Sequence, residues 1–378
     1  MNLTPGEIAR YQRHLSLAGF GTEAQLKLKA ARVLVIGAGG LGCPALLYLA
    51  AAGVGHLVLV DADKVDVSNL QRQILYTEAD AGMLKVDAAA RRLRALNPFV
   101  EIVTHAENIT RANALALMRD VDLVVDGSDN FATRYLVNDA CVLADKPLVY
   151  GAIHAFEGQV SVFNFRRGVT YRCLFPEPPD PGSVPNCAEG GVIGVLPGLI
   201  GTMQATEAIK VITGVGEPLA GKLWLYNTLT NTSQTLRLTL DPKSRLISEL
   251  PPEGYGATCS VPPFEPETSA AHVRDLLDAP NARSKIQLID VRESWERDLG
   301  AIQPSVHIPL GELENGEAQS ALHRLDAAIE TVVYCASGRR SLRGAAMLRD
   351  RYGFPSATSM KGGYKAWVAD EAAAVRAE

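Results

Sequence analysis

A glycine-rich turn close to the N-terminus restricts the possible folds of this chain more than any other feature. The motif Gly37-Ala-Gly39-Gly40-Leu-Gly42 follows the apolar run 32–37 and leads into helical residues from about 41 to 52. Short β-branched runs then alternate with helical patterns as far as residue 152. This alternation predicts right-handed parallel crossovers, and therefore an α/β fold with a doubly wound sheet.

From residue 158 onwards the pattern changes to alternating polar and apolar residues. The stretches 158–165 and 222–240 both show it, and such alternation predicts antiparallel strands that extend the same sheet. Between them, the apolar segment 195–212 predicts a helix. We therefore expect a Rossmann-like, mostly parallel sheet with an antiparallel extension.

The last part of the chain predicts a second unit. Segment 248–268 has the Pro and Gly density of an interdomain linker. Beyond it, strands are expected at 287–291 and 331–335, each followed by a helix. The predicted domains are residues 1–247 and 269–378, the second being a small α/β domain.

The composition excludes several classes of protein. The 378 residues include 37 Lys and Arg against 42 Asp and Glu, a net charge of −5, which gives no electrostatic footprint for nucleic acid or an anionic membrane. Six irregularly spaced cysteines argue against a disulfide framework and favour a reducing cytoplasm. The uncharged stretch 33–55 is interrupted by glycines and Pro44, so it predicts a strand, a turn and a buried helix rather than a membrane span.

The glycine turn also predicts a nucleotide site. Its glycines, in a GxGxxG pattern between a strand and a helix, are Gly37, Gly39, Gly40 and Gly42. Glycines let the backbone approach a phosphate, and the helix N-terminus supplies N–H donors. Asp61 and Asp63 close the next strand, at the distance expected of an acidic ribose ligand.

Charged residues further along favour a triphosphate over a redox dinucleotide. Arg72 and Lys85 place two cations near the same mouth, and Asp129 follows the strand 121–126. This set suits a triphosphate with Mg²⁺ whose α-phosphorus is attacked. Taken singly, Arg72 or Lys85 could be a solvated surface charge, and Asp129 could cap the helix that begins near Phe131.

These motifs together resemble the MoeB/ThiF/HesA adenylyltransferases, relatives of the ubiquitin-activating enzymes. The resemblance covers roughly residues 5–250 and rests on RYQRH, GAGGLG, DADKVDVSNLQRQ, Lys85 and DGSDN. It implies that ATP binds here, with Asp61 and Asp63 near the ribose and phosphates and Asp129 holding Mg²⁺. It gives four further residues a place at the nucleotide, namely Arg72 and Lys85 on the phosphates and Asn69 and Gln73 in the pocket.

The resemblance also implies the reaction and the assembly. A ubiquitin-like sulfur-carrier protein presents its C-terminal Gly-Gly carboxylate to the α-phosphate, AMP becomes attached and pyrophosphate leaves. Because a carboxylate is a poor acyl donor, the mixed anhydride supplies the leaving group it lacks. Arg13 would reach the γ-phosphate in the other subunit's site, which implies a homodimer.

Cys335 is the cysteine most indicative of chemistry. It ends the predicted strand 331–335, and the loop Cys335-Ala-Ser-Gly338-Arg339-Arg340-Ser341 leads into a helix, so backbone N–H groups would face the sulfur and favour an anionic persulfide. A phosphatase loop, CxxxxxR, would need arginine at position 341, where this chain has serine. With LIDVRESWE, HIPL and KGGYKAW, residues 270–370 resemble a rhodanese sulfurtransferase domain, which implies catalytic roles for Cys335 and Arg340.

The first resemblance also gives expectations for three other cysteines. Family members often hold zinc with two CxxC pairs, but here the first motif is Thr170-Tyr-Arg-Cys173 and the later region offers only Cys259. We therefore expect no zinc. Cys187 occupies the place of a cysteine on a loop over the adenylate, which implies a covalent carrier intermediate such as an acyl disulfide. From its spacing alone, an inert thiol is equally consistent.

The sequence thus predicts an adenylating domain fused to a persulfide donor. Cys335 would take sulfur from a cysteine desulfurase or thiosulfate and convert the adenylated carrier into a thiocarboxylate, for molybdopterin, thiamin or tRNA thiolation. One alternative is an NAD-dependent oxidoreductase with a rhodanese appendage, which Arg72, Lys85 and Asp129 disfavour. The other is a non-enzymatic interaction module, which the intact acidic and cysteine residues disfavour.

Overall fold

The computed structural model describes residues 2–178, 191–252, 255, 266–280, 282 and 285–377, with side chains as far as residue 370. The chain divides into two compact units, Met1–Cys259 and Ser260–Glu378. In the described part of the chain, no helix is long and apolar enough to cross a membrane.

The first unit is built on a sheet of eight strands in the order β3-β2-β1-β4-β5-β6-β7-β8. Neighbours from β3 to β5 pair in parallel, and the pairs from β5 to β8 are antiparallel. The predicted mostly parallel sheet and its antiparallel extension are therefore confirmed. The strands are β1 (Arg32–Ile36), β2 (His56–Val60), β3 (Glu101–His105), β4 (Leu123–Asp126), β5 (Leu148–His154), β6 (Glu157–Phe163), β7 (Lys222–Asn227) and β8 (Thr232–Arg237).

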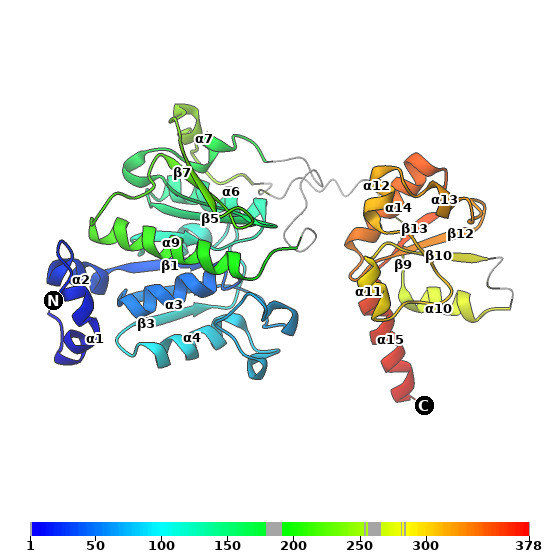
Figure 1. The fold of residues 1–378 in the computed structure, drawn as a ribbon, viewed down its shortest axis with the longest axis horizontal. Helices are drawn as coiled ribbons and strands as arrows, with labels where there is room; N and C mark the ends of the chain where they lie inside the picture. Colours follow the sequence, from blue (N-terminus) through cyan, green and yellow to red (C-terminus); the bar gives the residue numbers. More distant parts are fainter. Residues whose placement is uncertain are drawn as a thin grey trace. The chain divides into compact units, whose positions relative to one another are not determined.

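Helices cover both faces of this sheet (Figure 1), because the parallel strands are apolar on both sides. Along β1, Val33 and Val35 pack into one core, while Leu34 and Ile36 pack into the other. The first core is covered by α2 (Gly21–Ala30), α3 (Gly42–Ala52), α4 (Lys85–Leu96) and α9 (Val195–Thr213). The second is covered by α5 (Ala114–Met118), α6 (Phe131–Leu143) and α7 (Tyr171–Leu174).

Shorter elements complete the first unit. An N-terminal helix precedes α2, and single 3₁₀ turns lie in the connections. They are α1 (Pro5–Leu15), η1 (Val67–Asn69), η2 (Glu78–Asp80), η3 (Phe165–Arg167) and η4 (Pro242–Arg245).

The strand order reverses beside β1, which pairs with β2 on one side and β4 on the other. The carboxyl ends of such neighbouring strands form the crevice where α/β sheets bind ligands. The turn after β1 packs tightly there, since the Gly127 N–H donates to the Ile36 carbonyl at 2.7 Å. A side chain at Gly42 would place its Cβ 1.9 Å from the Gly37 oxygen, so only glycine fits at the start of α3.

The second unit is a separate parallel sheet of five strands in the order β11-β10-β12-β13-β9. The predicted strands 287–291 and 331–335 correspond to β10 and β12, each displaced by one residue, and three further strands were not predicted. The strands are β9 (Glu267–Thr268), β10 (Ile286–Asp290), β11 (Val306–His307), β12 (Glu330–Tyr334) and β13 (Ala357–Met360).

Helices also cover both faces of this smaller sheet. One core contains residues of α12 (Leu310–Asn315), α13 (Gln319–Leu322) and α14 (Arg339–Tyr352). The other contains residues of α10 (Ala270–Asp278) and α15 (Gly363–Ala377). The short helix α11 (Ser294–Asp298) follows β10.

Described residues at both ends of the predicted linker 248–268 pack with the folded units. Leu250 and Tyr255 are buried in a core of the first unit, and the Tyr255 hydroxyl donates to Asp139 Oδ2 at 2.6 Å. At the other end, Glu267 and Thr268 form β9 of the second unit.

Candidate functional site

A pocket of about 440 Å³ lies at the carboxyl ends of β1, β2 and β4. Most of the residues expected to bind nucleotide line it, although they come from four separate stretches of sequence. They are Gly37, Gly39, Gly40, Asp61, Asp63, Asn69, Arg72, Gln73, Lys85 and Asp129. The fold therefore brings these predicted residues together, and their chemical roles remain predictions.

Ala38, in the middle of the glycine turn, is held by hydrogen bonds through both its backbone N–H and its backbone carbonyl. Its N–H donates to Asp61 Oδ2 at 2.8 Å, and its carbonyl accepts from the Tyr76 hydroxyl at 2.7 Å. Asp61 Oδ1 accepts a further bond from the Asp63 N–H at 2.8 Å. Burial raises the pKa of Asp61, against the opposing charge of Lys85 and these hydrogen bonds. The turn is thus preorganised with its backbone facing the pocket.

The pocket wall carries cations and a buried amide. Lys85 Nζ pairs with Asp63 Oδ2 at 2.8 Å, and the lysine side chain is only 6% exposed. Gln73 Nε2 donates to Asn69 Oδ1 at 2.9 Å. Its Oε1 is buried and has no hydrogen-bond partner among the described residues. A buried acceptor without a partner is costly, so this wall is suited to a ligand with a hydrogen-bond donor.

Asp129 lies on the exposed side of this pocket, directly after β4. The helix cap is Asn130, whose side chain accepts from the Thr133 N–H at 2.9 Å. The possibility that Asp129 caps α6 is therefore wrong. Carboxylate oxygens suit Mg²⁺, which binds proteins through one or two carboxylates together with substrate phosphates and water. The described residues contain no group of three or more His, Cys, Asp or Glu able to hold a metal, and the role of Asp129 at Mg²⁺ stays a prediction.

One buried cation in the pocket was not predicted from the sequence. Arg134 is 8% exposed and lines the same cavity, with its guanidinium carbon 5.6 Å and 5.8 Å from the ring centres of Phe131 and Tyr150. Burial raises the pKa of Asp126, and the charge of Arg134 opposes that rise. No local signal identified it, because the ring of Tyr150 comes from β5 and meets Arg134 only in the folded unit.

Two residues expected at the nucleotide do not line this pocket, and a third predicted residue cannot be placed. Arg13 is exposed on α1 and does not line the cavity. Gly42 is also absent from the lining and instead allows the close approach to Gly37. Cys187 lies outside the described residues.

Cys173 lies in a cluster of hydrogen-bond donors away from the pocket. Its Sγ is 3.1 Å from Ser244 Oγ and 3.4 Å from the backbone nitrogens of Thr170 and Asp241. Although burial acts to raise it, the pKa of Cys173 is lowered because these donors stabilise the thiolate. The position that would complete the first CxxC motif is filled by Thr170, and the expectation of no zinc stays a prediction.

The second candidate site surrounds Cys335. Its side chain is 1% exposed at the end of β12, and Sγ accepts from the Gly338 N–H at 3.2 Å and from Ser341 Oγ at 3.6 Å. Gly338, at φ +96°, turns the chain into α14. The predicted arrangement of a strand, a tight loop and a helix N-terminus around the sulfur is therefore present.

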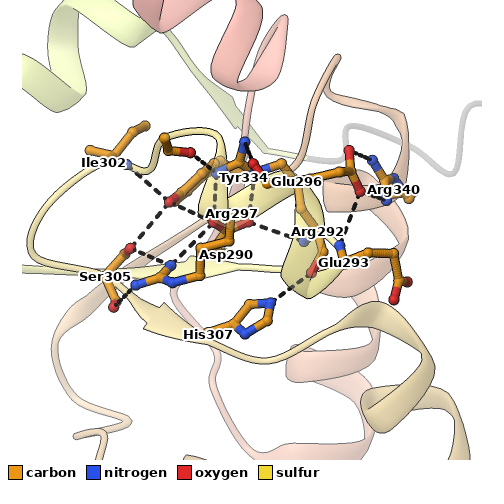
Figure 2. Close-up of polar contacts among 11 residues, drawn as sticks. Asp290, Arg292, Glu293, Glu296, Arg297, Ile302, Ser305, His307, Tyr334 and Arg340 are labelled. Carbon is orange, nitrogen blue, oxygen red and sulfur yellow. Dashed lines mark hydrogen bonds and ion pairs between the residues drawn. The ribbon is translucent and has the colours of Figure 1, made fainter.

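Arg340, expected beside Cys335, forms a two-point ion pair that the sequence did not predict. Its two terminal nitrogens donate to the Glu296 carboxylate at 2.7 and 2.6 Å (Figure 2). Glu296 belongs to α11, and 44 residues separate the partners. Neighbouring Asp290 is buried and accepts from Arg292 at 2.8 Å and from Arg297 at 3.1 Å (Figure 2).

Comparison with known proteins places both sites in a family. The model of the ThiF family matches residues 11–246, and that of the rhodanese-like domain matches residues 269–370. The chain belongs to the ThiF family and carries a C-terminal rhodanese-like domain. The resemblance drawn from the motifs is thus confirmed.

Individual relatives of this ThiF-family chain agree. A probable adenylyltransferase/sulfurtransferase, MoeZ of Mycobacterium tuberculosis, is 44% identical over 97% of this chain and 94% of its own. A sulfur carrier protein adenylyltransferase of Thermus thermophilus is 50% identical over 69% of this chain and 100% of its own. The crystal structure of Escherichia coli MccB with a MccA peptide shares the fold, with TM-score 0.56 and 24% identity over 62% of this chain and 72% of that one. The ThiF-family chain is an enzyme of the adenylyltransferase and sulfurtransferase type.

Proposed function

We propose that this ThiF-family enzyme adenylates the C-terminal glycine of a ubiquitin-like sulfur-carrier protein ending in Gly-Gly and then replaces one carboxylate oxygen with sulfur from Cys335. One observation carries the proposal. A glycine turn, buried Lys85, Arg72 and Asp129 line one pocket, in a chain whose second unit surrounds a cysteine with N–H and O–H donors. One relative of this chain is named for both activities, and another is named as a sulfur carrier protein adenylyltransferase.

In the first step, a carboxylate oxygen of the carrier attacks the α-phosphorus of ATP. The bond from that phosphorus to the bridging oxygen breaks, and pyrophosphate leaves with the electron pair. Lys85 and Arg72 would neutralise phosphate charge, and backbone N–H groups of the turn around Ala38 would bind phosphate oxygens. Asp129 would hold the Mg²⁺ that balances the charge on the leaving group.

In the second step, the outer sulfur of a Cys335 persulfide attacks the acyl carbon, and AMP leaves. The carrier is then joined to Cys335 through an acyl disulfide. A thiol attacks the Cys335 sulfur of this bond, and the C-terminal thiocarboxylate leaves with the electron pair. A second thiol then reduces the disulfide left on Cys335. Cys187 is a candidate for the first of these thiols, and a cysteine desulfurase or thiosulfate is the proposed source of sulfur.

We also propose a homodimer in the cytoplasm. Arg13 is exposed on α1 and outside the pocket of its own subunit, which suits a role in the site of a second copy. The four cysteines that the structure describes are free thiols, as a reducing compartment would keep them. The carrier released with its thiocarboxylate would supply sulfur for the synthesis of molybdopterin, thiamin or thiolated tRNA.

The proposal is tested by intact-mass spectrometry of the carrier. The protein is incubated with ATP, Mg²⁺, thiosulfate, a thiol reductant and each small Gly-Gly-ending protein of its genome. We expect one carrier to gain the mass difference between sulfur and oxygen. With Cys335→Ala, the carrier should still be adenylated but should receive no sulfur. If no carrier supports ATP–pyrophosphate exchange, the adenylation proposal is wrong, and if Cys335→Ala still yields thiocarboxylate at the normal rate, the relay is wrong.

A further inference from the structure

Arg340 is the less exposed of the two arginines in the Cys335 loop, and its charge is matched by one carboxylate. Both Glu296 oxygens accept from its terminal nitrogens, and the two side chains are only 22% and 11% exposed. Charge-assisted bidentate pairs of this kind fix the guanidinium in one place and cancel its charge locally. The remaining N–H groups of the guanidinium stay available as donors, because a two-point pair uses two of the five.

The charges around this pair leave a small positive excess. Buried Asp290 faces two guanidiniums, those of Arg292 and Arg297 (Figure 2). Arg339, next to Arg340 in the same loop, and Glu293, just before α11, are both exposed, and their opposite charges offset each other. Against that background, the Glu296–Arg340 pair adds no net charge. Arg340 without Glu296 would add a full positive charge at the first turn of α14, which forms the mouth of the loop and lies within electrostatic range of the Cys335 thiol.

We propose that Glu296 is a specificity-determining residue of the sulfur-transfer site, because by pairing with Arg340 it sets how strongly the mouth of the Cys335 loop attracts anionic sulfur donors. Glu296 acts through Arg340 and is therefore a positioning residue. The inference rests on sulfur transfer at Cys335, and it concerns the selection of the donor, not the carrier or the adenylation step.

Thiosulfate shows why the charge matters. The Cys335 thiolate attacks the outer sulfur of thiosulfate, the sulfur–sulfur bond breaks, and sulfite leaves with the electron pair, so that a persulfide remains on the enzyme. The thiolate and the dianionic donor repel each other. A cation at the mouth of the loop reduces that repulsion. Pairing the cation with Glu296 makes the reduction smaller.

The test separates charge from access by using two alkylating reagents of similar size. Iodoacetate is anionic and iodoacetamide is neutral, so the ratio of their rates at Cys335, followed by peptide mass spectrometry, reports the local field. We expect Glu296→Gln to raise the iodoacetate to iodoacetamide ratio by roughly three- to tenfold, and Arg340→Gln to lower it. The double variant should return close to the wild-type ratio, since both partners are then neutral.

Two controls accompany this measurement. Glu314, on α12, pairs with Arg343 at 3.1 Å. Arg343 lies on α14, as Arg340 does, but outside the Cys335 loop. Glu314→Gln therefore removes a Glu–Arg pair and should leave the ratio at Cys335 unchanged. Cys173, in the first unit, reports within the same sample whether the reagents behave normally. If the iodoacetate to iodoacetamide ratio stays unchanged or falls in Glu296→Gln, the proposal is wrong. An equal change in both rates also contradicts it, because that result would indicate altered access to Cys335.

A steady-state measurement gives the functional counterpart. With thiosulfate as donor and cyanide as acceptor, Glu296→Gln should lower the KM for thiosulfate by roughly three- to tenfold, and Arg340→Gln should raise it. An unchanged or higher KM in Glu296→Gln contradicts the inference. Because alkylation needs no turnover, failure of the sulfur-relay proposal would leave the alkylation result standing, and the two outcomes are distinguishable.

Discussion

The backbone N–H of Tyr364 donates a 2.7 Å hydrogen bond to the carbonyl oxygen of Cys335. The next N–H of α15, that of Lys365, donates to the Ala336 carbonyl at 3.1 Å. The first turn of α15 therefore holds the outer side of the loop through its carbonyls. On the inner side, the Gly338 N–H donates to the sulfur. The position of the reactive thiol thus depends on a helix that begins 28 residues later.

Replacing Gly363 with alanine should displace this loop. A Cβ at that position would lie 2.2 Å from the Cys335 oxygen and 2.7 Å from the Ser337 nitrogen, so the loop must move. Since a misplacement of about 1 Å can cost roughly a hundredfold in rate, we expect a loss of that order in thiosulfate:cyanide sulfurtransferase activity. ATP–pyrophosphate exchange with the carrier, which takes place in the first unit, should be retained.

Gly353→Ala is the matched control for the Gly363 variant. Gly353 has φ +77°, and no atom lies within 4 Å of the position that a Cβ would take, so alanine there introduces backbone strain without a contact to the loop. Sulfurtransferase activity should survive in this control. Comparable losses in both variants would mean that backbone strain, and not displacement of the Cys335 loop, explains the effect.

Tyr76→Phe should loosen the glycine turn. The Tyr76 hydroxyl is buried and donates to the Ala38 carbonyl, and losing one such bond lowers the free energy of unfolding by about 1 kcal/mol. We expect ATP to bind roughly two- to tenfold more weakly, measured by calorimetric titration. Tyr48→Phe, at a side chain that is 55% exposed, should change neither quantity. Unaltered ATP binding in Tyr76→Phe would show that the turn keeps its shape without the hydrogen bond from Tyr76.

Asp129→Asn should impair adenylation through the metal. Replacing a carboxylate oxygen by an amide weakens Mg²⁺ binding, so ATP–pyrophosphate exchange should fall by roughly a hundredfold and require more Mg²⁺ for half-maximal rate. Asp120→Asn, at an exposed residue outside the pocket, serves as the control. Normal exchange at normal Mg²⁺ in Asp129→Asn would remove this residue from the metal site.

Acid should destabilise the second unit through Asp290. Although burial acts to raise it, the pKa of Asp290 lies below its usual 3.8, because hydrogen bonds from Arg292 and Tyr334 favour the ionised form. A carboxyl group with a lowered folded-state pKa stabilises the native state above the unfolded-state value. This stabilisation is lost as the pH falls through the range below 3.8. The hydrogen-exchange protection factors of β10 and β12 peptides in the full-length protein, which are corrected for the intrinsic pH dependence of exchange, should therefore fall in that range.

Asp290→Asn should remove this acid dependence. It should also lower the free energy of unfolding of the second unit at neutral pH by about 3 kcal/mol, since the buried guanidinium of Arg292 and the partly exposed one of Arg297 lose their carboxylate. Asp298→Asn, at an exposed residue nearby, should leave the exchange profile unchanged. If the acid dependence persists in Asp290→Asn, other carboxyl groups are responsible for it.

Local patterns predicted the larger sheet and most of its pocket. The glycine turn and the β-branched runs around it carry strong periodicity, and the carboxyl ends of parallel strands must meet at one edge. The sequence could not predict β9 and β11, which have two residues each, because such short runs show no alternation. The sequence allows Asp129 as the cap of α6, whereas the structure has Asn130. Both residue types cap helices, and their side-chain directions differ only in the folded turn.

Ion pairs between distant segments were beyond sequence reasoning. Arg340 was expected at the thiol, but Glu296 lies 44 residues earlier and looks like any charged residue of a short helix. Arg134 was missed because a buried arginine on an apolar helix becomes visible only when Phe131 and Tyr150 pack against it. In both cases tertiary contacts, and not local propensity, determine what the side chain does.

The edge pairing of the second sheet has a consequence for biosynthesis. β9, the first strand of that unit, pairs with β13, its last, through Glu267 with Ser359 and Thr268 with Met360. The ribosome must therefore release nearly the entire second unit before this edge can close. The residues that line the nucleotide pocket end at Val192, so this pocket does not depend on the second unit being released. During translation, the ATP-binding half can therefore fold while the sulfur-handling half is still leaving the ribosome.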